Sequence, residues 1–148
     1  MQILNFPACD FRVKNSENKI RIFDIIRKKF VVLQPEEWVR LHAVHWLIDQ
    51  KKYPSSLFNV EKKITINKLT KRYDIVVFNP DGTIELLVEC KAYTQSLTQE
   101  VFDQVARYNL QIRASYLMLT NGMQHYFCKL DPEEEKYTFL EQIPDFSR

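Results

Sequence analysis

The feature that most constrains this chain is a pair of apolar segments joined by a turn. Residues 72–78 (RYDIVVF) and 84–90 (IELLVEC) are rich in β-branched and other apolar side chains, and the sequence NPDG lies between them at 79–82. Asparagine, proline, aspartate and glycine are typical of tight turns. The two segments are therefore predicted to form a β-hairpin, with residues 84–90 as a buried strand.

The segments on either side of the hairpin are predicted to be helices and strands in a mixed order. Pro35, followed by two acidic residues, is typical of a helix start. A second helix is predicted to begin at Ser96 or Thr98, with Gln99 completing a capping box that starts at Ser96. The predicted elements are a helix at 35–50, a strand at 59–66, the two hairpin strands, a helix ending near 112, and strands at 115–120 and 124–130.

The chain of 148 residues is long enough for one domain with a sizeable core. Residues 1–34 are predicted to be an N-terminal extension with short strands, in which a β-hairpin is expected. Residues 35–130 form the predicted core, and residues 131–148 an acidic, irregular tail.

The composition excludes several classes of protein. Only two residues are glycine, and no GxxxxGK[ST] or GxGxxG sequence occurs, so a built-in NTPase site is not expected. No apolar run approaches the length of a membrane-spanning helix. An odd number of cysteines, three, without metal-type spacing or a signal peptide predicts reduced thiols and a cytoplasmic protein. The formal net charge of +2 permits nucleic-acid binding but does not argue for it.

Three charged residues interrupt the apolar hairpin. Asp74 lies between Tyr73 and Ile75 in the first strand, and Glu89 and Lys91 lie at the end of the second. Because side chains alternate faces along a strand, Glu89 and Lys91 are predicted to share a face, and the hairpin can bring Asp74 close to Glu89. Neighbouring carboxylates repel each other unless a cation lies between them, and Mg²⁺ prefers oxygen ligands. The pattern favours a divalent-metal site for phosphodiester hydrolysis, in which Lys91 orients or activates the attacking water.

Both predicted helices can contribute to such a site. The first begins with Glu36 and Glu37, either of which could supply a third carboxylate or simply favour the positive end of the helix. In the second helix, polar residues at intervals of three and four form one stripe. The stripe could contact DNA phosphates, orient Lys91 or remain a solvated face, and it comprises Gln104, Arg107, Tyr108 and Gln111.

Together these residues resemble the PD-(D/E)xK nuclease superfamily. Asp74 followed by Glu89-Cys90-Lys91 is similar to its catalytic pattern, and QVARY at 104–108 looks like the Q-x-x-x-Y element of several of its branches. A narrower resemblance covers about residues 20–130. There RKKFVVLQPEEWVRLHAVHWLI and KRYDIVVFNPDGTIELLVECKAY are similar to the N-terminal nuclease domain of type I restriction enzyme R subunits.

The resemblance implies an α/β fold with a three-layer, restriction-endonuclease-like core, in which helices flank a central mixed sheet in the order α-β-β-β-α-β-β. It implies Mg²⁺-dependent DNA cleavage, with Mn²⁺ as a substitute. The implied catalytic residues are Asp74, Glu89, Lys91 and Gln104, and the implied metal ligands are Asp74, Glu89, Glu37 and the carbonyl of Cys90. The implied substrate contacts are Arg107, Tyr108, Arg72 and Arg40. The implied partners are DNA, a restriction motor or specificity subunit, and a second copy of the chain in a homodimer.

R subunits continue into a helicase motor, and this sequence lacks the motifs for one, so we expect a nuclease domain without the motor.

Two other interpretations remain open at this point. A non-catalytic module of the same fold could instead use the basic clusters to hold DNA or a protein. In the third interpretation, the charges in the hairpin form a buried ion pair in a purely structural subunit.

Overall fold

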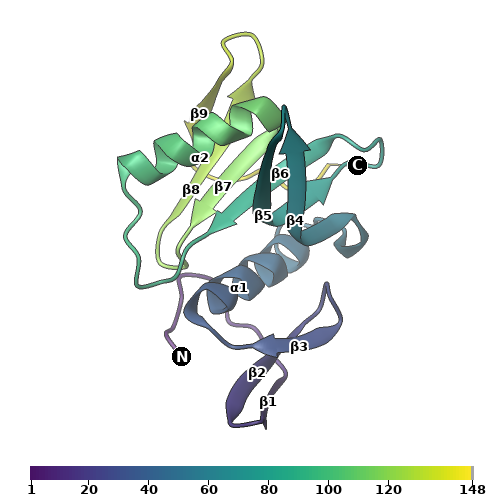
Figure 1. The fold of residues 1–148 in the computed structure, drawn as a ribbon, viewed down its shortest axis with the longest axis vertical. Coiled ribbons are helices and arrows are strands. Elements are labelled where there is room, and N and C mark those ends of the chain that lie inside the picture. The colour runs from purple at the N-terminus through teal and green to yellow at the C-terminus, as the bar shows by residue number, and fades with distance from the viewer. Residues whose placement is uncertain (148) are drawn as a thin grey trace.

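The computed structural model describes residues 1–147, which form two β-sheets and two α-helices (Figure 1). The predicted mixed α/β class is confirmed. None of the helices in this part of the chain combines the length and hydropathy that a membrane span needs. In chain order the elements are β1 (Val13–Ser16), β2 (Lys19–Asp24), β3 (Lys29–Val32), α1 (Pro35–Asp49), the 3-10 turn η1 (Ser55–Leu57), β4 (Phe58–Ile66), β5 (Leu69–Phe78), β6 (Ile84–Cys90), α2 (Gln99–Ile112), β7 (Tyr116–Thr120), β8 (His125–Asp131) and β9 (Lys136–Leu140).

The larger sheet follows the chain from one edge to the other, in the order β4-β5-β6-β7-β8-β9. The predicted hairpin forms its β5–β6 pair, and Gly82 supplies the positive φ of 90° that the connecting turn requires. The β6–β7 pair is parallel, because α2 carries the chain back across the sheet between these two strands. The remaining neighbours in the sheet pair antiparallel.

The two helices cover opposite faces of this sheet. Val39, Val44 and Leu47 of α1 pack in one core cluster with side chains of the central strands, among them Val88. Val105 of α2 packs in a second cluster that includes the strand residues Val76, Leu87 and Leu117. The central strand β6 is therefore apolar on both faces, which explains its nearly continuous hydrophobic sequence.

The start of α2 differs in one detail from the prediction. Thr98 is the cap, and its Oγ1 accepts a hydrogen bond from the backbone N–H of Val101 at 3.2 Å. The capping box that Ser96 and Gln99 were expected to form is wrong, because Gln99 donates to the Asp103 carboxylate instead. The helix ends at Ile112, and its C-cap, Arg113, has a positive φ of 61° that turns the chain toward β7.

The N-terminal extension contains the expected hairpin, formed by β2 and β3, and adds a third antiparallel strand, β1. The strand missed by sequence reasoning, β1, is short and mostly exposed, so it lacks a strong apolar pattern. Asp24, at the end of β2, is fully buried and accepts hydrogen bonds from the backbone N–H groups of Ile26 and Arg27. It also accepts one from Arg40 of α1, at 2.7 Å, which fastens the small sheet to the helix.

The prediction of an irregular C-terminal tail is wrong, because residues 136–140 form β9 and pair with β8. Four acidic residues within 131–135 form the turn between these strands. The hydroxyl of Tyr137 donates to the carbonyls of Ala114 and Asn109, and so anchors β9 beneath the C-terminal end of α2. The order of the core elements is thus α-β-β-β-α-β-β-β.

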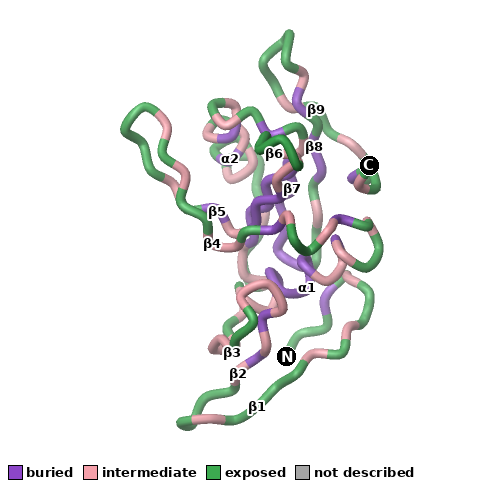
Figure 2. The backbone as a smooth tube through the Cα atoms, turned by 90° about the vertical axis from the view of Figure 1, so that its right-hand side faces the viewer, coloured by how far each residue is buried: buried purple, intermediate pink, exposed green. Residues whose placement is uncertain are grey.

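The hairpin of β4 and β5 extends beyond the rest of the sheet. Pairing of β5 with β6 begins only at Ile75, so the chain from Glu61 to Asp74 is a two-stranded ribbon. Figure 2 shows its exposed tip standing away from the body of the molecule. Glu61 has a positive φ of 55° and faces Asp74 across a break in the regular pairing of β4 and β5. The ribbon therefore departs from the sheet next to Asp74.

Candidate functional site

The two predicted catalytic acids lie side by side on neighbouring strands. Ile75 of β5 pairs with Val88 of β6, which places Asp74 beside Glu89 in the antiparallel register. Asp74 Oδ2 accepts a hydrogen bond from the backbone N–H of Cys90 at 2.7 Å. That bond fixes one carboxylate against the end of β6, at the point where β5 leaves the sheet.

Asp74 lies in an environment that disfavours its charge. Its pKa is raised to about 7, chiefly by burial and further by the negative charges of Glu89, Glu36 and Glu61. The hydrogen bond from Cys90 acts in the opposite direction, since it stabilises the ionised form. Asp74 is thus a buried carboxyl group whose ionisation is opposed both by its burial and by the acids around it.

Of the two acids at the start of α1, Glu36 is the one whose charge acts on Asp74. Burial raises the pKa of Glu36, Lys91 lowers it, and the charges of Glu37, Glu61 and Glu89 raise it further. Glu37 instead accepts hydrogen bonds from the guanidinium group of Arg40, one turn along α1. The expected metal-ligand role of Glu37 is therefore not supported by its contacts, because its carboxylate is committed to a cation on its own helix.

Arg40, an expected substrate contact, is buried beneath the protein surface. Its side chain is 1% exposed and forms ion pairs with both Asp24 and Glu37. Burial by itself would raise the pKa of Asp24, yet the charge of Arg40, with its hydrogen bonds and those of the backbone, holds that pKa below its usual value. Arg40 thus joins the N-terminal sheet to α1 and is not available to a nucleic-acid strand in this structure.

Lys91 follows β6 directly and shares the region of Glu36. Its backbone N–H donates to the carbonyl of Thr120 at 2.8 Å, which extends the contact between β6 and β7 by one residue. Among residues 1–147, its ammonium group has no ion-pair partner within 4.0 Å, and its charge acts on the nearby Glu36. The Cys90 side chain points into the α1 core, so only its backbone faces the acids.

A second lysine reaches the acids, and sequence reasoning missed its role. Lys71 Nζ lies 2.9 Å from Glu89 Oε1, and the Glu89 side chain is only 8% exposed. The same ammonium lies 4.8 Å from the ring centre of Tyr73 and 5.2 Å from that of Tyr108. Lys71 precedes Asp74 by three residues in a basic cluster, which the sequence does not distinguish from a solvated surface.

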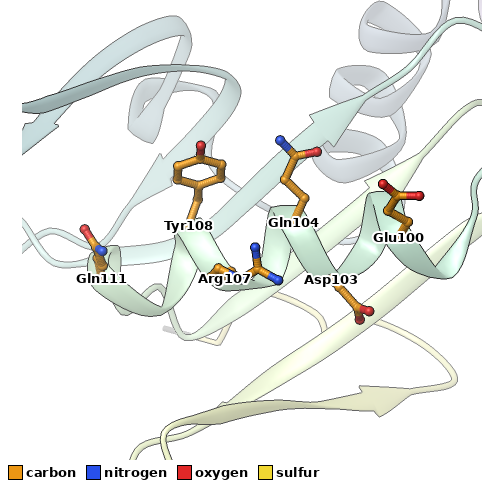
Figure 3. A pocket seen from close by; sticks show the side chains of 6 residues that line it. All are labelled: Glu100, Asp103, Gln104, Arg107, Tyr108 and Gln111. Carbon is orange, nitrogen blue, oxygen red and sulfur yellow. The ribbon is translucent and has the colours of Figure 1, made fainter.

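The polar stripe of α2 borders an open groove of about 590 Å³. Figure 3 shows Glu100, Gln104 and Tyr108 rising from the same side of the helix. The ring of Tyr108 contacts the ammonium group of Lys71, which in turn pairs with Glu89. The stripe is therefore linked to the acids by Lys71, and not by Lys91 as the sequence suggested. The groove is lined by Glu100, Asp103, Gln104, Arg107, Tyr108 and Gln111.

The remaining predicted substrate contact, Arg72, lies on the exposed ribbon. Its guanidinium pairs with Glu61 at 3.3 Å, and 56% of its side chain is exposed. Arg72 thus lies exposed on the ribbon that carries Lys71, whereas Glu61 is half-buried and also pairs with Arg27 at 3.2 Å.

The chemistry of the donor groups fits a hard divalent cation, although residues 1–147 contain no ready-made cluster of three His, Cys, Asp or Glu ligands. Asp74, Glu89 and Glu36 offer carboxylate oxygens, which Mg²⁺ prefers. Burial and the neighbouring acids raise the pKa of Asp74, and a bound divalent ion would favour its ionised form. In the structure, the cation that touches this cluster is the ammonium group of Lys71.

Comparison with known protein families gives a match over residues 35–144, from the start of α1 to beyond β9. The matching family is described as "Type I restriction enzyme R protein N terminus (HSDR_N)". A search of curated proteins found no match. The match spans most of the chain and includes both sheet acids, Lys91 and the α2 stripe. This chain therefore belongs to the family of type I restriction enzyme R protein N-terminal domains.

Proposed function

We propose that this protein is a divalent-metal-dependent nuclease that hydrolyses phosphodiester bonds in DNA through a PD-(D/E)xK-type site. The observation that carries the proposal is the placement of Asp74 beside Glu89, with Glu36 and Lys91 next to them, at the end of the β5–β6 hairpin. Membership of a restriction-enzyme domain family supports the same activity.

In this proposal Asp74, Glu89 and Glu36 hold the metal ion, with the backbone carbonyl of Cys90. Each comes from a different element, β5, β6 or α1, and both strands lie in the centre of a packed sheet. Such a frame keeps carboxylate oxygens in place, which is what a catalytic metal site requires. When bound, Mg²⁺ or Mn²⁺ would neutralise the acids, make water more acidic and draw charge from the phosphate.

Lys91 is proposed to orient the attacking water or to stabilise negative charge on the phosphate. Its side chain lies near Glu36 and has no ion-pair partner among the described residues, so it can turn toward a substrate. Gln104, Arg107 and Tyr108 line the groove beside α2, where polar and cationic groups suit a nucleic-acid backbone. Partners in this proposal are DNA, a restriction motor or specificity subunit, and a second copy of the chain.

One observation favours a second candidate function, a DNA-binding module without catalysis. Glu89 is already paired with Lys71, and no group of three metal ligands is assembled among residues 1–147. A binding module would keep the fold and use the basic ribbon for phosphate contacts. Such a module would not need three carboxylates that repel one another, and we therefore prefer the nuclease interpretation.

The experiment that tests the proposal is a cleavage assay with purified protein. Supercoiled plasmid and linear single-stranded DNA are incubated with Mg²⁺, Mn²⁺ or EDTA. Wild type is compared with Asp74→Ala and Lys91→Ala, and with Lys129→Ala, which removes an exposed lysine of β8. We expect cleavage that depends on metal, is lost in the first two variants and persists in the third.

Two other outcomes would redirect the assignment. Binding of DNA without cleavage, together with no calorimetric signal for Mn²⁺, would favour the binding module. Clear Mn²⁺ binding that requires Asp74, but no cleavage, would indicate that a partner subunit or another nucleic-acid substrate is needed.

A further inference from the structure

The ion pair between Lys71 and Glu89 lies inside the carboxylate cluster to which the proposed function assigns a metal ion. The Lys71 Nζ–Glu89 Oε1 distance is 2.9 Å, and the two side chains are 26% and 8% exposed. Glu89 also acts on Asp74 and Glu36, whose pKa values are both raised. The ammonium group is thus a positive charge in direct contact with one of the acids of the site.

The surroundings of Lys71 hold its ammonium group where it is. The faces of Tyr73 and Tyr108 lie 4.8 and 5.2 Å from Nζ, at distances at which aromatic rings attract a cation. One ring comes from β5 and the other from α2. Two elements of the fold therefore position this lysine against Glu89, which distinguishes it from the exposed lysines nearby on the ribbon.

An ammonium ion and a divalent metal ion compete for the same oxygens. A lysine ammonium donates hydrogen bonds to a carboxylate, whereas Mg²⁺ binds through the lone pairs of that carboxylate. The two cations repel each other when they share one ligand group, and the repulsion is strong where Glu89 is shielded from water. Binding of the metal is thus opposed for as long as Lys71 remains in contact.

We propose that Lys71 is an internal cation that occupies Glu89 in the metal-free protein and must leave before a divalent ion can bind there. This inference rests on the proposed metal-dependent function and adds a residue that controls it. Lys71 stabilises the acidic cluster while no metal ion is bound. Breaking its contact with Glu89 therefore makes the free energy of metal binding less favourable. The displaced ammonium, on the exposed ribbon, becomes available to a phosphate group.

Direct measurement of Mn²⁺ binding by isothermal titration calorimetry, without DNA, tests this inference. Lys71→Met removes the charge and keeps an unbranched side chain. Lys63→Met is the matched control, because Lys63 is an exposed lysine of the same ribbon and its loss changes the net charge equally. Lys71→Arg retains a cation at the position. Thermal unfolding of each protein in EDTA and in Mn²⁺ gives a second readout and shows whether each variant folds.

We expect Lys71→Met to bind Mn²⁺ at least tenfold more tightly than wild type, and Lys63→Met and Lys71→Arg to bind within about threefold of wild type. In EDTA, Lys71→Met should unfold at a lower temperature than Lys63→Met, and Mn²⁺ should raise its unfolding temperature by more. Mn²⁺ binding by Lys71→Met but not by wild type would support the inference further.

Failures of the two proposals are distinguishable. If wild type binds Mn²⁺ in a manner that requires Asp74, and Lys71→Met binds equally or more weakly, the inference is overturned while the metal site stands. If neither wild type nor any folded Lys71 variant binds Mn²⁺, the metal-dependent function itself fails. Should Lys71→Met not fold, Lys71→Gln replaces it with the same expectation.

Discussion

Asp74 is held by a backbone hydrogen bond in a place where its charge is unfavourable. Its pKa is raised to about 7, first by burial and then by the neighbouring acids. An aspartate in an unfolded chain has a pKa of about 3.9. Between about pH 4 and pH 7 the folded protein therefore keeps a proton that the unfolded chain has lost. Because the folded state binds more protons in that interval, stability should fall as the pH rises through it.

The variant Asp74→Asn tests this coupling, because its amide oxygen can still accept the N–H of Cys90. For wild type in EDTA, the contribution of Asp74 to the free energy of unfolding should drop from pH 5 to pH 8, by at most about 3 kcal/mol. The variant should lack that part of the drop and be the more stable protein at pH 8. Urea unfolding at both pH values measures the difference. An identical pH dependence in both proteins would show that Asp74 is an ordinary surface carboxylate.

Arg40 has a structural role that its sequence neighbourhood does not reveal. Asp24 is fully buried and pairs with the buried Arg40 at 2.7 Å and with the partly exposed Arg27 at 3.4 Å. Arg40 is the buried partner, and removal of one member of a buried ion pair costs about 3–5 kcal/mol. We expect this loss for Arg40→Met, measured by urea unfolding. The matched control is Arg72→Met, whose exposed pair with Glu61 should cost less than about 1 kcal/mol. Similar stability of the two variants would contradict the assigned role.

The sequence identified the acids on the strands better than the acid on the helix. Asp74 and Glu89 could be placed because a short turn fixes the alignment of two adjacent strands. Glu36 and Glu37 both lie in the first turn of α1, and each is an equally good helix-start residue. Which one acts on the sheet acids depends on the rotation of the helix, and that depends on contacts with residues distant in sequence, such as the pair between Arg40 and Asp24. No local pattern contains this information.

At the scale of elements, β9 shows how an edge strand escapes notice. Its side chains are exposed or half-buried, and four acidic residues precede it, so the local composition is that of a tail. Its backbone pairs with β8, and the hydroxyl of Tyr137 ties it to the carbonyls of Asn109 in α2 and Ala114 just after α2. Long-range contacts of this kind become visible only once the sheet is assembled.

The ribbon of β4 and β5 is the element best suited to follow a DNA backbone. Residues 61–72 contain five basic residues and a single acid, Glu61. The ribbon leaves the sheet beside Asp74, and its tip stands away from the molecule (Figure 2). A two-stranded ribbon fits the major groove of duplex DNA, and each phosphate contact adds to the salt dependence of binding.

Replacement of Lys62 and Lys63 by glutamine should therefore weaken duplex binding and make it less sensitive to salt. The plot of log affinity against log salt has a negative slope, and loss of two phosphate contacts should make that slope shallower by about 2. Fluorescence anisotropy in EDTA measures the slope without cleavage. The control replaces Lys129 and Lys136, exposed lysines on either side of the acidic β8–β9 turn, and should leave the slope unchanged. Equal effects of the two pairs would show that the ribbon has no special role.

At the scale of the whole molecule, the charges are separated in space. The ribbon is basic, the N-terminal sheet carries further lysines and arginines, and the acidic turn lies between β8 and β9. The near-neutral total of +2 conceals this separation. A field of this kind orients a polyanion toward the ribbon before contact. Composition alone could not predict the arrangement, because it depends on where the topology places each hairpin.

The number of candidate sites also sets an expectation for the products. Asp74, Glu89 and Lys91 form one such site in the described chain, whereas a double-strand break needs one cut in each strand. Provided that the proposed nuclease activity holds, we expect supercoiled plasmid to pass first to open circles and then, after a lag, to linear DNA. The rate of the first step should be proportional to protein concentration.

Linear DNA that forms without open circles at low protein concentration would instead require two chains acting together. A plasmid already nicked at one position is the control, because a monomer should cut its opposite strand no faster than it cuts intact DNA.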